Sequence, residues 1–131
     1  MTQQYGPAEM KPITIHTVDD SPSMRMLLKQ ALASRGYEVS QSEDGQQALE
    51  WLADNQPDLV ITDINMPRLD GFGLIEAMRE MECHRDRPIL VLTTESSDEK
   101  KARARQAGAT GWIVKPFDPE KLAEAVRRVT H

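Results

Sequence analysis

The sequence predicts a single α/β domain whose parallel sheet of five strands is doubly wound, with helices on both faces. Five short apolar runs alternate with stretches in which apolar residues recur at helical spacing. A length of 131 residues suits one domain with a substantial core. Strict alternation of strand and helix is typical of sheets with right-handed crossover connections.

The first unit joins a strand over Ile13–Asp19 to a helix that begins after Ser21. Ser21 is of a type favoured as N-cap, and Pro22 is of the type favoured at the first helical position. Gly36 is expected to end the helix. The apolar residues at helical spacing are Met24, Leu27, Leu28, Ala31 and Leu32.

The next two units differ in how deeply their strands should be buried. Tyr37–Gln41 is short and polar, which indicates an edge strand, and Asp44 is placed to cap the following helix. Asp58–Asp63 is continuously apolar in its middle, which is typical of a strand buried on both faces. A turn over residues 65–71 leads to the third helix. The apolar residues of these two helices are Ala48, Leu49, Leu52, Leu74, Ile75, Met78 and Met81.

The last two units complete the pattern. The fourth strand, Ile89–Thr93, precedes a capping box of Ser96 and Glu99. The fifth strand, Trp112–Lys115, precedes a helix capped by Asp118. The apolar stripe of this final helix consists of Leu122, Ala125, Val126 and Val129.

The helix between Asp98 and Gly108 stands apart because its only apolar residues are alanines. Burial contributes about 0.8 kcal/mol per methylene, so alanines anchor a helix far less than the leucines elsewhere in the chain. Two interpretations stay open. One is a short exposed helix, and the other is a helix held loosely enough to shift when the neighbouring strand end changes.

The composition is that of a soluble globular protein, with 39% hydrophobic and 28% charged residues. The single cysteine, Cys83, excludes an internal disulfide and fits a reducing compartment. No segment approaches the roughly 18 apolar residues of a membrane span, and the polar start lacks a secretory signal. We therefore expect a cytoplasmic protein with a flexible tail over residues 1–11 and one domain over residues 12–131.

Charge is unevenly distributed along the chain. Residues 1–95 hold 8 Lys or Arg against 16 Asp or Glu, whereas residues 96–131 hold 8 against 5. This asymmetry indicates either ordinary solvated helix faces or a basic docking face on the last third of the chain. Nucleic acid is a poor partner for a chain with a net charge of −5 and no DNA-binding motif.

Polar residues end four of the predicted strands: Asp19 and Asp20, Asp63, Thr93 and Lys115. The carboxyl ends of parallel strands form one edge of a sheet, where ligands bind, so these side chains should meet. The three carboxylates suit Mg²⁺. An aspartate can also act as a nucleophile, and Asp63 follows the most apolar strand. Lys115 would balance the charge of a phosphoryl group, and the Thr93 hydroxyl would donate a hydrogen bond to it.

Four segments together resemble the signature of the receiver domain of bacterial response regulators: Val18–Ser21, Asp63–Gly71, Thr93–Glu95 and Lys115–Phe117. The resemblance covers about residues 12–131 and is strongest to the stand-alone chemotaxis (CheY-like) type. It implies a flavodoxin-like sheet of strand order 2-1-3-4-5 with five helices. It also implies a phosphorylation switch of a two-component system rather than an enzyme, limited to self-phosphotransfer and slow autodephosphorylation.

The same resemblance implies a role for each residue at this edge. Asp63 would accept a phosphoryl group from the phosphohistidine of a histidine kinase. Mg²⁺ would be held by Asp20, Asp63 and the backbone carbonyl of Asn65, with Asp19 acting through water. Lys115 would contact the phosphoryl oxygens.

The resemblance further implies a cis peptide bond between Lys115 and Pro116, and a switch that pairs Thr93 with Trp112. The family usually has Tyr or Phe at the position of Trp112, whose indole is bulkier and donates only through its ring N–H. Movement inward and flat packing on the fourth helix both stay open. Thr94 is β-branched where a small residue is common, and we expect Thr94→Ala to speed acetyl-phosphate labelling or its decay.

Output is expected through contact with another protein, because the final helix ends near His131 and leaves no room for a further module. The resemblance implies a chemotaxis-type histidine kinase upstream and a flagellar motor switch protein downstream. Action as a phosphate sink, or on another kinase, is the alternative. We expect no nucleic-acid or membrane partner and a monomeric chain. The expected contact face holds Lys100, Lys101, Arg103, Arg105, Trp112, Lys121, Arg127 and Arg128.

The polar edge consists of Asp19, Asp20, Asp63, Thr93 and Lys115. Two other classes of protein share part of this set of residues. A phosphatase of the haloacid-dehalogenase type also joins an aspartate, a lysine and Mg²⁺, but it needs a second carboxylate where this chain has Asn65. An amide cannot accept a proton from attacking water. A flavodoxin would place the phosphate of FMN near Asp19 and Asp20, which would repel it.

The three histidines are not expected to belong to the polar edge. His16, in the first strand, should be a buried and hydrogen-bonded core residue. His84 and His131 are expected at the surface.

Overall fold

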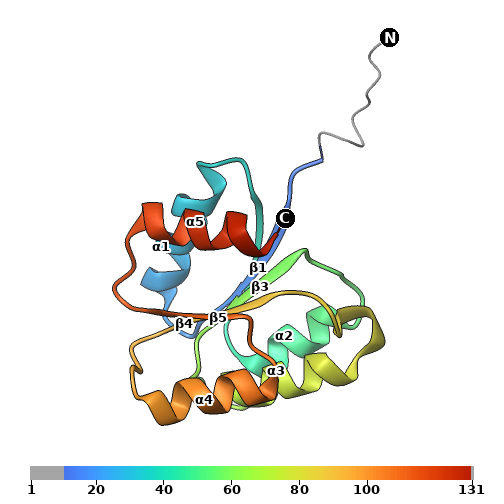
Figure 1. Ribbon diagram of the computed structural model, residues 1–131. Helices are drawn as coiled ribbons and strands as arrows, with labels where there is room; N and C mark the ends of the chain where they lie inside the picture. The colour runs from blue at the N-terminus through green and yellow to red at the C-terminus, as the bar shows by residue number, and fades with distance from the viewer. Residues whose placement is uncertain (1–10, 131) are drawn as a thin grey trace.

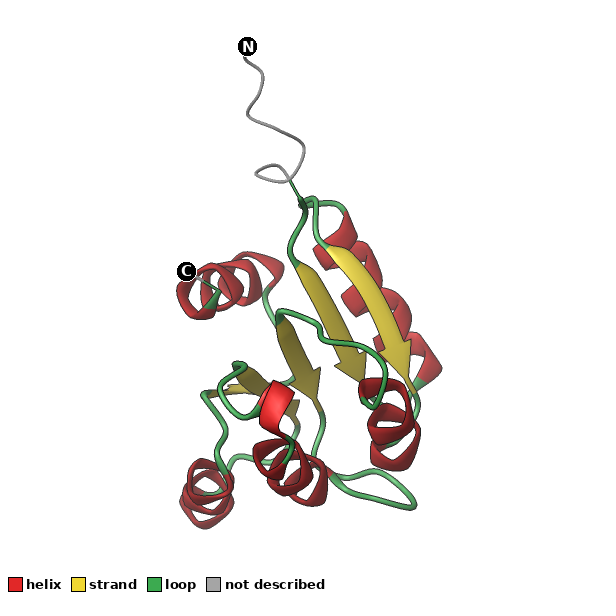
Figure 2. Cartoon of the chain, turned by 90° about the vertical axis from the view of Figure 1, so that its right-hand side faces the viewer, coloured by secondary structure: helices red, strands yellow, loops and turns green. Residues whose placement is uncertain are grey.

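The computed structural model describes residues 11–130 as one parallel five-stranded sheet with helices on both faces. Residues 1–10, most of the predicted tail, and His131 lie outside the described residues. The strand order β2-β1-β3-β4-β5 confirms the flavodoxin-like order. All neighbouring strands are parallel, and the arrows that face the viewer in Figure 2 point the same way. The strands are β1 (Thr14–Val18), β2 (Glu38–Ser42), β3 (Leu59–Thr62), β4 (Ile89–Thr93) and β5 (Gly111–Val114).

Five α-helices cover the two faces of the sheet (Figure 1). One face carries α1 (Pro22–Ala33) and α5 (Pro119–Val129). The other carries α2 (Gly45–Leu52), α3 (Gly71–Glu80) and α4 (Asp98–Ala107). A short 3-10 helix, η3 (Glu82–His84), follows α3. Among the described residues, no helix is both long and apolar enough to cross a membrane.

The core consists of two apolar layers, one on each side of the sheet. In β4, Leu90 and Leu92 pack towards α1 and α5, whereas Ile89 and Val91 pack towards α2, α3 and α4. Alternate side chains of a strand point to opposite faces, so a strand covered on both sides must be apolar throughout. All residues of β3 and β4 are buried, as their continuous apolar runs predict.

Local capping follows the sequence closely, with one correction. Ser21, Asp44 and Asp118 cap α1, α2 and α5 as predicted. The cap of α4 is Ser97 rather than Ser96, and its hydroxyl accepts a hydrogen bond from the Lys100 amide at 3.2 Å. Ser96 and Ser97 carry the same hydroxyl group, so the side chain does not decide between them. The conformation of the loop after β4 decides which of the two has the extended backbone of an N-cap.

Several predicted boundaries and exposures are shifted. The second strand begins one residue later than predicted, and α1 ends at Ala33, with Gly36 in the following turn at φ +90°. Leu27 lies at core spacing but is 50% exposed, because the buried stripe of α1 runs through Leu28 and Leu32.

The prediction that His84 is a surface residue is wrong. This side chain is fully buried, and its Nε2 lies 2.9 Å from the carbonyl oxygen of Leu52. The η3 turn folds His84 back under the end of α2, a tertiary contact that the local sequence does not predict. His16 is buried as predicted, with its ring nitrogens 2.7 Å from the hydroxyl oxygens of Ser40 and Ser42.

Candidate functional site

The three aspartates predicted at the sheet edge lie together. Asp19 follows β1 and Asp63 follows β3, and the two strands are in register through Val18 and Thr62. The Asp63 amide donates a hydrogen bond to the Val18 carbonyl at 2.9 Å, which fixes the segments that follow β1 and β3 where they leave the sheet. Oxygens of Asp19, Asp20 and Asp63 all lie within 4.8 Å of one another.

Lys115 places its ammonium between the two buried carboxylates. Its Nζ lies 2.8 Å from Asp19 and 2.9 Å from Asp63, and its side chain is 10% exposed. The backbone amide of Lys115 donates to the Thr93 carbonyl at 2.8 Å, so β4 holds the lysine in place. The Lys115–Pro116 peptide bond is cis, as the resemblance implied.

The charge state of Lys115 follows from these contacts. Burial by itself would lower the pKa of Lys115, but the hydrogen bonds to Asp19 and Asp63 outweigh burial and raise the pKa above its usual value. Lys115 is therefore an ammonium at neutral pH. The cluster itself thus holds three carboxyl groups and one ammonium.

The donor set fits a hard divalent cation. Each buried carboxylate keeps one oxygen on Lys115, while its other oxygen accepts a backbone amide, that of Ser21 for Asp19 and of Ile64 for Asp63. Asp20 is exposed and completes the cluster from the solvent side. Oxygen ligands and a local excess of negative charge are what Mg²⁺ requires.

The two predicted switch residues lie on neighbouring strands. Thr93 is fully buried at the end of β4, and its hydroxyl oxygen accepts a hydrogen bond from the Glu95 amide at 3.4 Å. Trp112 on β5 is half-buried, and its indole N–H donates to the Glu95 carbonyl at 3.1 Å. Both residues thus contact the β4–α4 loop, in which Thr94 is exposed.

Glu95 is a connection that sequence reasoning missed. Its carboxylate accepts hydrogen bonds from the side-chain amide of Asn65 and from the ammonium of Lys100, each at 3.0 Å. The hydrogen bond from Asn65, followed by that from Lys100, lowers the pKa of Glu95. Glu95 therefore links the β3–α3 loop to the N-terminal turn of α4. The spacing of these residues along the chain gives no signal for the pairing.

The predicted contact face lies on α4, β5 and α5. Its cations are not equally free, because Lys100 pairs with Glu95 and the Arg103 guanidinium lies 4.0 Å above the Phe72 ring. Arg105, Lys121, Arg127 and Arg128 are exposed.

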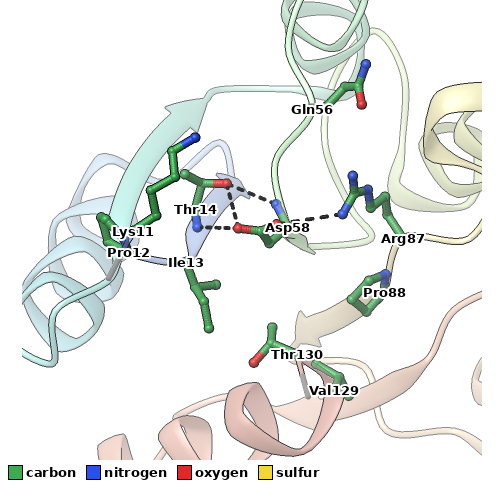
Figure 3. A pocket seen from close by; sticks show the side chains of 10 residues that line it. All are labelled: Lys11, Pro12, Ile13, Thr14, Gln56, Asp58, Arg87, Pro88, Val129 and Thr130. Atoms are coloured by element: carbon green, nitrogen blue, oxygen red, sulfur yellow. Dashed lines mark hydrogen bonds and ion pairs between the residues drawn. The ribbon is translucent and has the colours of Figure 1, made fainter. Parts of the chain in front are cut away.

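The opposite edge of the sheet holds a separate cleft of about 520 Å³. Asp58 lies in this cleft, accepts hydrogen bonds from Thr14 and pairs with Arg87 at 3.6 Å (Figure 3). The residues of the polar edge do not line it.

Comparisons with known proteins agree with this geometry. Residues 15–127 match the response regulator receiver domain family. The chain is 40% identical over 112 residues to the transcriptional regulatory protein PrrA of Mycobacterium tuberculosis, covering 86% of this chain and 46% of that protein. The chain spans about half the length of the curated relatives it matches.

Two solved structures are similar over almost their whole length. The chemotaxis response regulator CheY4 of Vibrio cholerae is 42% identical with a TM-score of 0.87, covering 91% of this chain and 99% of that one. The receiver domain of the sensor histidine kinase PA1611 of Pseudomonas aeruginosa, with a magnesium ion coordinated in its active-site cleft, is 28% identical with a TM-score of 0.85, covering 92% and 98%. The sequence motifs, the sheet order and the family match together show that this chain belongs to the response regulator receiver domain family.

Proposed function

We propose that this chain is a phosphorylation switch in which Asp63 accepts a phosphoryl group from the phosphohistidine of a histidine kinase. The observation that carries the proposal is the bridge of Lys115 between Asp19 and Asp63 inside a cluster of three carboxylates. A carboxylate oxygen of Asp63 forms the new P–O bond while the P–N bond of phosphohistidine breaks. The imidazole nitrogen keeps the electron pair and takes a proton from solvent.

The residues around Asp63 divide the remaining tasks. Asp19, Asp20, Asp63 and the Asn65 backbone carbonyl would hold Mg²⁺, which when bound supplies positive charge to the phosphoryl oxygens. The Lys115 ammonium contacts the phosphoryl oxygens and stabilises the negative charge that builds on them. The Thr93 hydroxyl donates a hydrogen bond to a phosphoryl oxygen and loses its contact with the Glu95 backbone amide. Trp112 then changes position, because its indole N–H is bonded to the carbonyl of the same residue.

An apolar groove beside the site suits the phosphodonor protein. It has a volume of about 380 Å³ and runs from Met24 and Leu27 on α1 to Phe117 beyond the cis peptide. Leu27 and its neighbour Met26 are the most exposed large apolar side chains among the described residues. A helix of the histidine kinase that carries the phosphohistidine would cover these side chains and bring the donor to Asp63.

The switch is not a turnover enzyme in this proposal. Asn65, two residues after Asp63, has an amide that cannot act as a general base for water. Hydrolysis of the aspartyl phosphate is therefore slow, and the phosphorylated state lasts long enough to be read by a partner.

Output is proposed through the α4–β5–α5 face, whose exposed cations favour an acidic partner. The 42% identity to the chemotaxis response regulator CheY4 supports a role in chemotaxis. The partner that we propose for this role is a flagellar motor switch protein. The similarity to PrrA supports the broader role of a response regulator. A phosphate sink is the second candidate, and binding of a motor switch protein by the phosphorylated chain but not by the unphosphorylated chain separates the two.

The decisive experiment adds acetyl phosphate and Mg²⁺ and follows the intact mass of the protein. We expect one alkali-labile phosphoryl adduct that is lost in Asp63→Asn and retained in Asp58→Asn, which changes an aspartate at the opposite edge of the sheet. Repeated turnover of phosphate esters would contradict the proposal.

A further inference from the structure

The β3–α3 loop, residues 63–70, contains an unusual backbone conformation three residues after Asn65. Arg68 has φ +68°, and it is the one non-glycine residue with positive φ in the described part of the chain. A bulky residue in the left-handed region persists where its surroundings hold it there, and such residues cluster at functional sites.

Arg68 is held by a carboxylate on another element. Its Nε and Nη2 donate to the two oxygens of Asp44 at 2.9 and 3.2 Å, a two-pronged pair that fixes both position and orientation. Asp44 is itself anchored, because it caps α2 through the Gln47 amide at 2.8 Å and its side chain is 11% exposed. The hydrogen bond with Arg68 lowers the pKa of Asp44, so the pair stays charged at neutral pH.

The backbone beside this pair packs directly on α2. The Gly45 amide donates to the Leu69 carbonyl at 3.1 Å, and a Cβ at Gly45 would overlap that carbonyl. At the end of the loop, the Gly71 amide donates to the Ile64 carbonyl at 2.8 Å, and a Cβ at Gly71 would overlap the Asp63 carbonyl. The loop is thus closed beneath Asp63 and held against the start of α2.

We propose that Arg68 and Asp44 form a latch that positions the β3–α3 loop, so that the Asn65 backbone carbonyl and Asp63 are pre-arranged for Mg²⁺. The inference rests on the proposed function of the polar edge. Arg68 and Asp44 act as positioning residues, since they reach the metal ligands only through the loop. Groups that orient metal ligands from outside influence metal affinity.

The test compares Mg²⁺ affinity, measured by titration calorimetry, in the wild type, Asp44→Asn, Arg68→Ala and the double variant. Asparagine is as good an N-cap as aspartate, so Asp44→Asn keeps α2 capped and removes the charge that holds Arg68. We expect each single variant to raise the Mg²⁺ dissociation constant about fivefold, which is the largest effect usual for an ion pair with an exposed partner. The double variant should raise the dissociation constant by the same factor and no more, because both substitutions break the same pair. Arg68→Lys, which keeps the charge without the fork, should recover part of the loss.

The two single variants change net charge in opposite directions, which separates a latch from a general charge effect. Removing the cation Arg68 would tighten Mg²⁺ binding if charge alone mattered, and that result would overturn the latch. An unchanged affinity in both variants, or an equal loss in Arg87→Ala, would also overturn it. Arg87 is a matched control because it forms an ion pair at the opposite edge of the sheet (Figure 3).

A second readout needs no metal. In the metal-free protein, the Gly45 and Gly71 amides should exchange their hydrogens about fivefold faster in Asp44→Asn and Arg68→Ala than in the wild type. Unchanged exchange at both amides would overturn the latch. Failure of the wild type to take a phosphoryl group, with Mg²⁺ affinity still dependent on the pair, would contradict only the proposed function.

Discussion

At the scale of single residues, the buried surroundings of Lys115 and His16 shift the pKa values of these two side chains in opposite directions. Lys115 keeps its charge in a buried place because two carboxylates outweigh the cost of removing it from water. His16 has no such partner. Burial lowers its pKa to about 4, and its ring stacks on Trp51 with centroids 4.0 Å apart.

Replacing Lys115 tests the charge balance of the polar edge. Lys115→Met keeps the length and apolar stem of the side chain but leaves Asp19 and Asp63 buried without their cation. We expect the free energy of unfolding at pH 7, without Mg²⁺, to fall by about 3 kcal/mol in urea titrations. Lys121→Met, at an exposed position of α5, should change it by less than about 0.5 kcal/mol. A similar effect in both variants would refute this account.

His16 makes stability depend on pH in a defined window. In the folded state its pKa is about 4 instead of 6.5, so the unfolded chain binds the proton first as pH falls. The contribution is complete above pH 6.5 and is lost on going down to pH 4, by about 3 kcal/mol in total. Urea unfolding of the wild type and His16→Gln between these pH values measures it. The wild type should lose this much more stability than the variant, and parallel pH profiles would exclude the assignment.

At the scale of elements, α4 is held by polar ties more than by apolar burial. Ala104 is the one residue of α4 that is fully buried, which agrees with the alanine-only pattern of the sequence. The C-terminal end of α4 is fixed by Arg79 on α3, whose guanidinium donates to the Gly108 carbonyl at 3.1 and 2.7 Å. The same guanidinium also donates to the carbonyls of His84, Arg85 and Arg87. The N-terminal side is tied through Glu95. Movement of α4 on phosphorylation stays a prediction.

Removing Arg79 should loosen the C-terminal end of α4. Arg79→Ala leaves several partly buried carbonyls without a donor, and each such loss costs about 1 kcal/mol or more. We expect the free energy of unfolding to fall by about 2 kcal/mol and amide exchange to rise through α4. Arg105→Ala, at an exposed position of the same helix, is the control and should change neither quantity. Equal exchange in both variants would show that α4 does not depend on Arg79.

At the scale of the whole molecule, metal binding and folding should be linked. The proposed site would bind Mg²⁺ in the folded protein and not in the unfolded chain, so at ten times its dissociation constant Mg²⁺ should add about 1.4 kcal/mol to stability. Asp20→Ala should abolish this gain without lowering metal-free stability, because Asp20 is exposed and its loss relieves repulsion within the cluster. Thermal unfolding with Mg²⁺ or with a chelator measures the gain. The exposed Asp54→Ala should keep it, and a gain that survives in Asp20→Ala would place the metal elsewhere.

Most of the fold and the polar edge were predictable from the sequence, because both depend on periodic, local signals. Apolar runs and N-caps place the strands and helices to within about three residues, and the parallel order brings Asp19, Asp63 and Lys115 to one edge. The exceptions depend on loops. Ser97 rather than Ser96 caps α4, and His84 is buried by a turn that carries no periodic signal.

The sequence alone thus determined the fold class, the strand order through its family resemblance, and which residues meet at the carboxyl edge of the sheet. The tertiary structure decided how those residues are connected: Lys115 shared between two aspartates, Glu95 joining Asn65 to α4, and Arg68 held by Asp44 in a left-handed conformation. The physical reason is that hydrophobic periodicity is written along the chain, whereas a hydrogen bond between two loops depends on where the sheet brings them together in space.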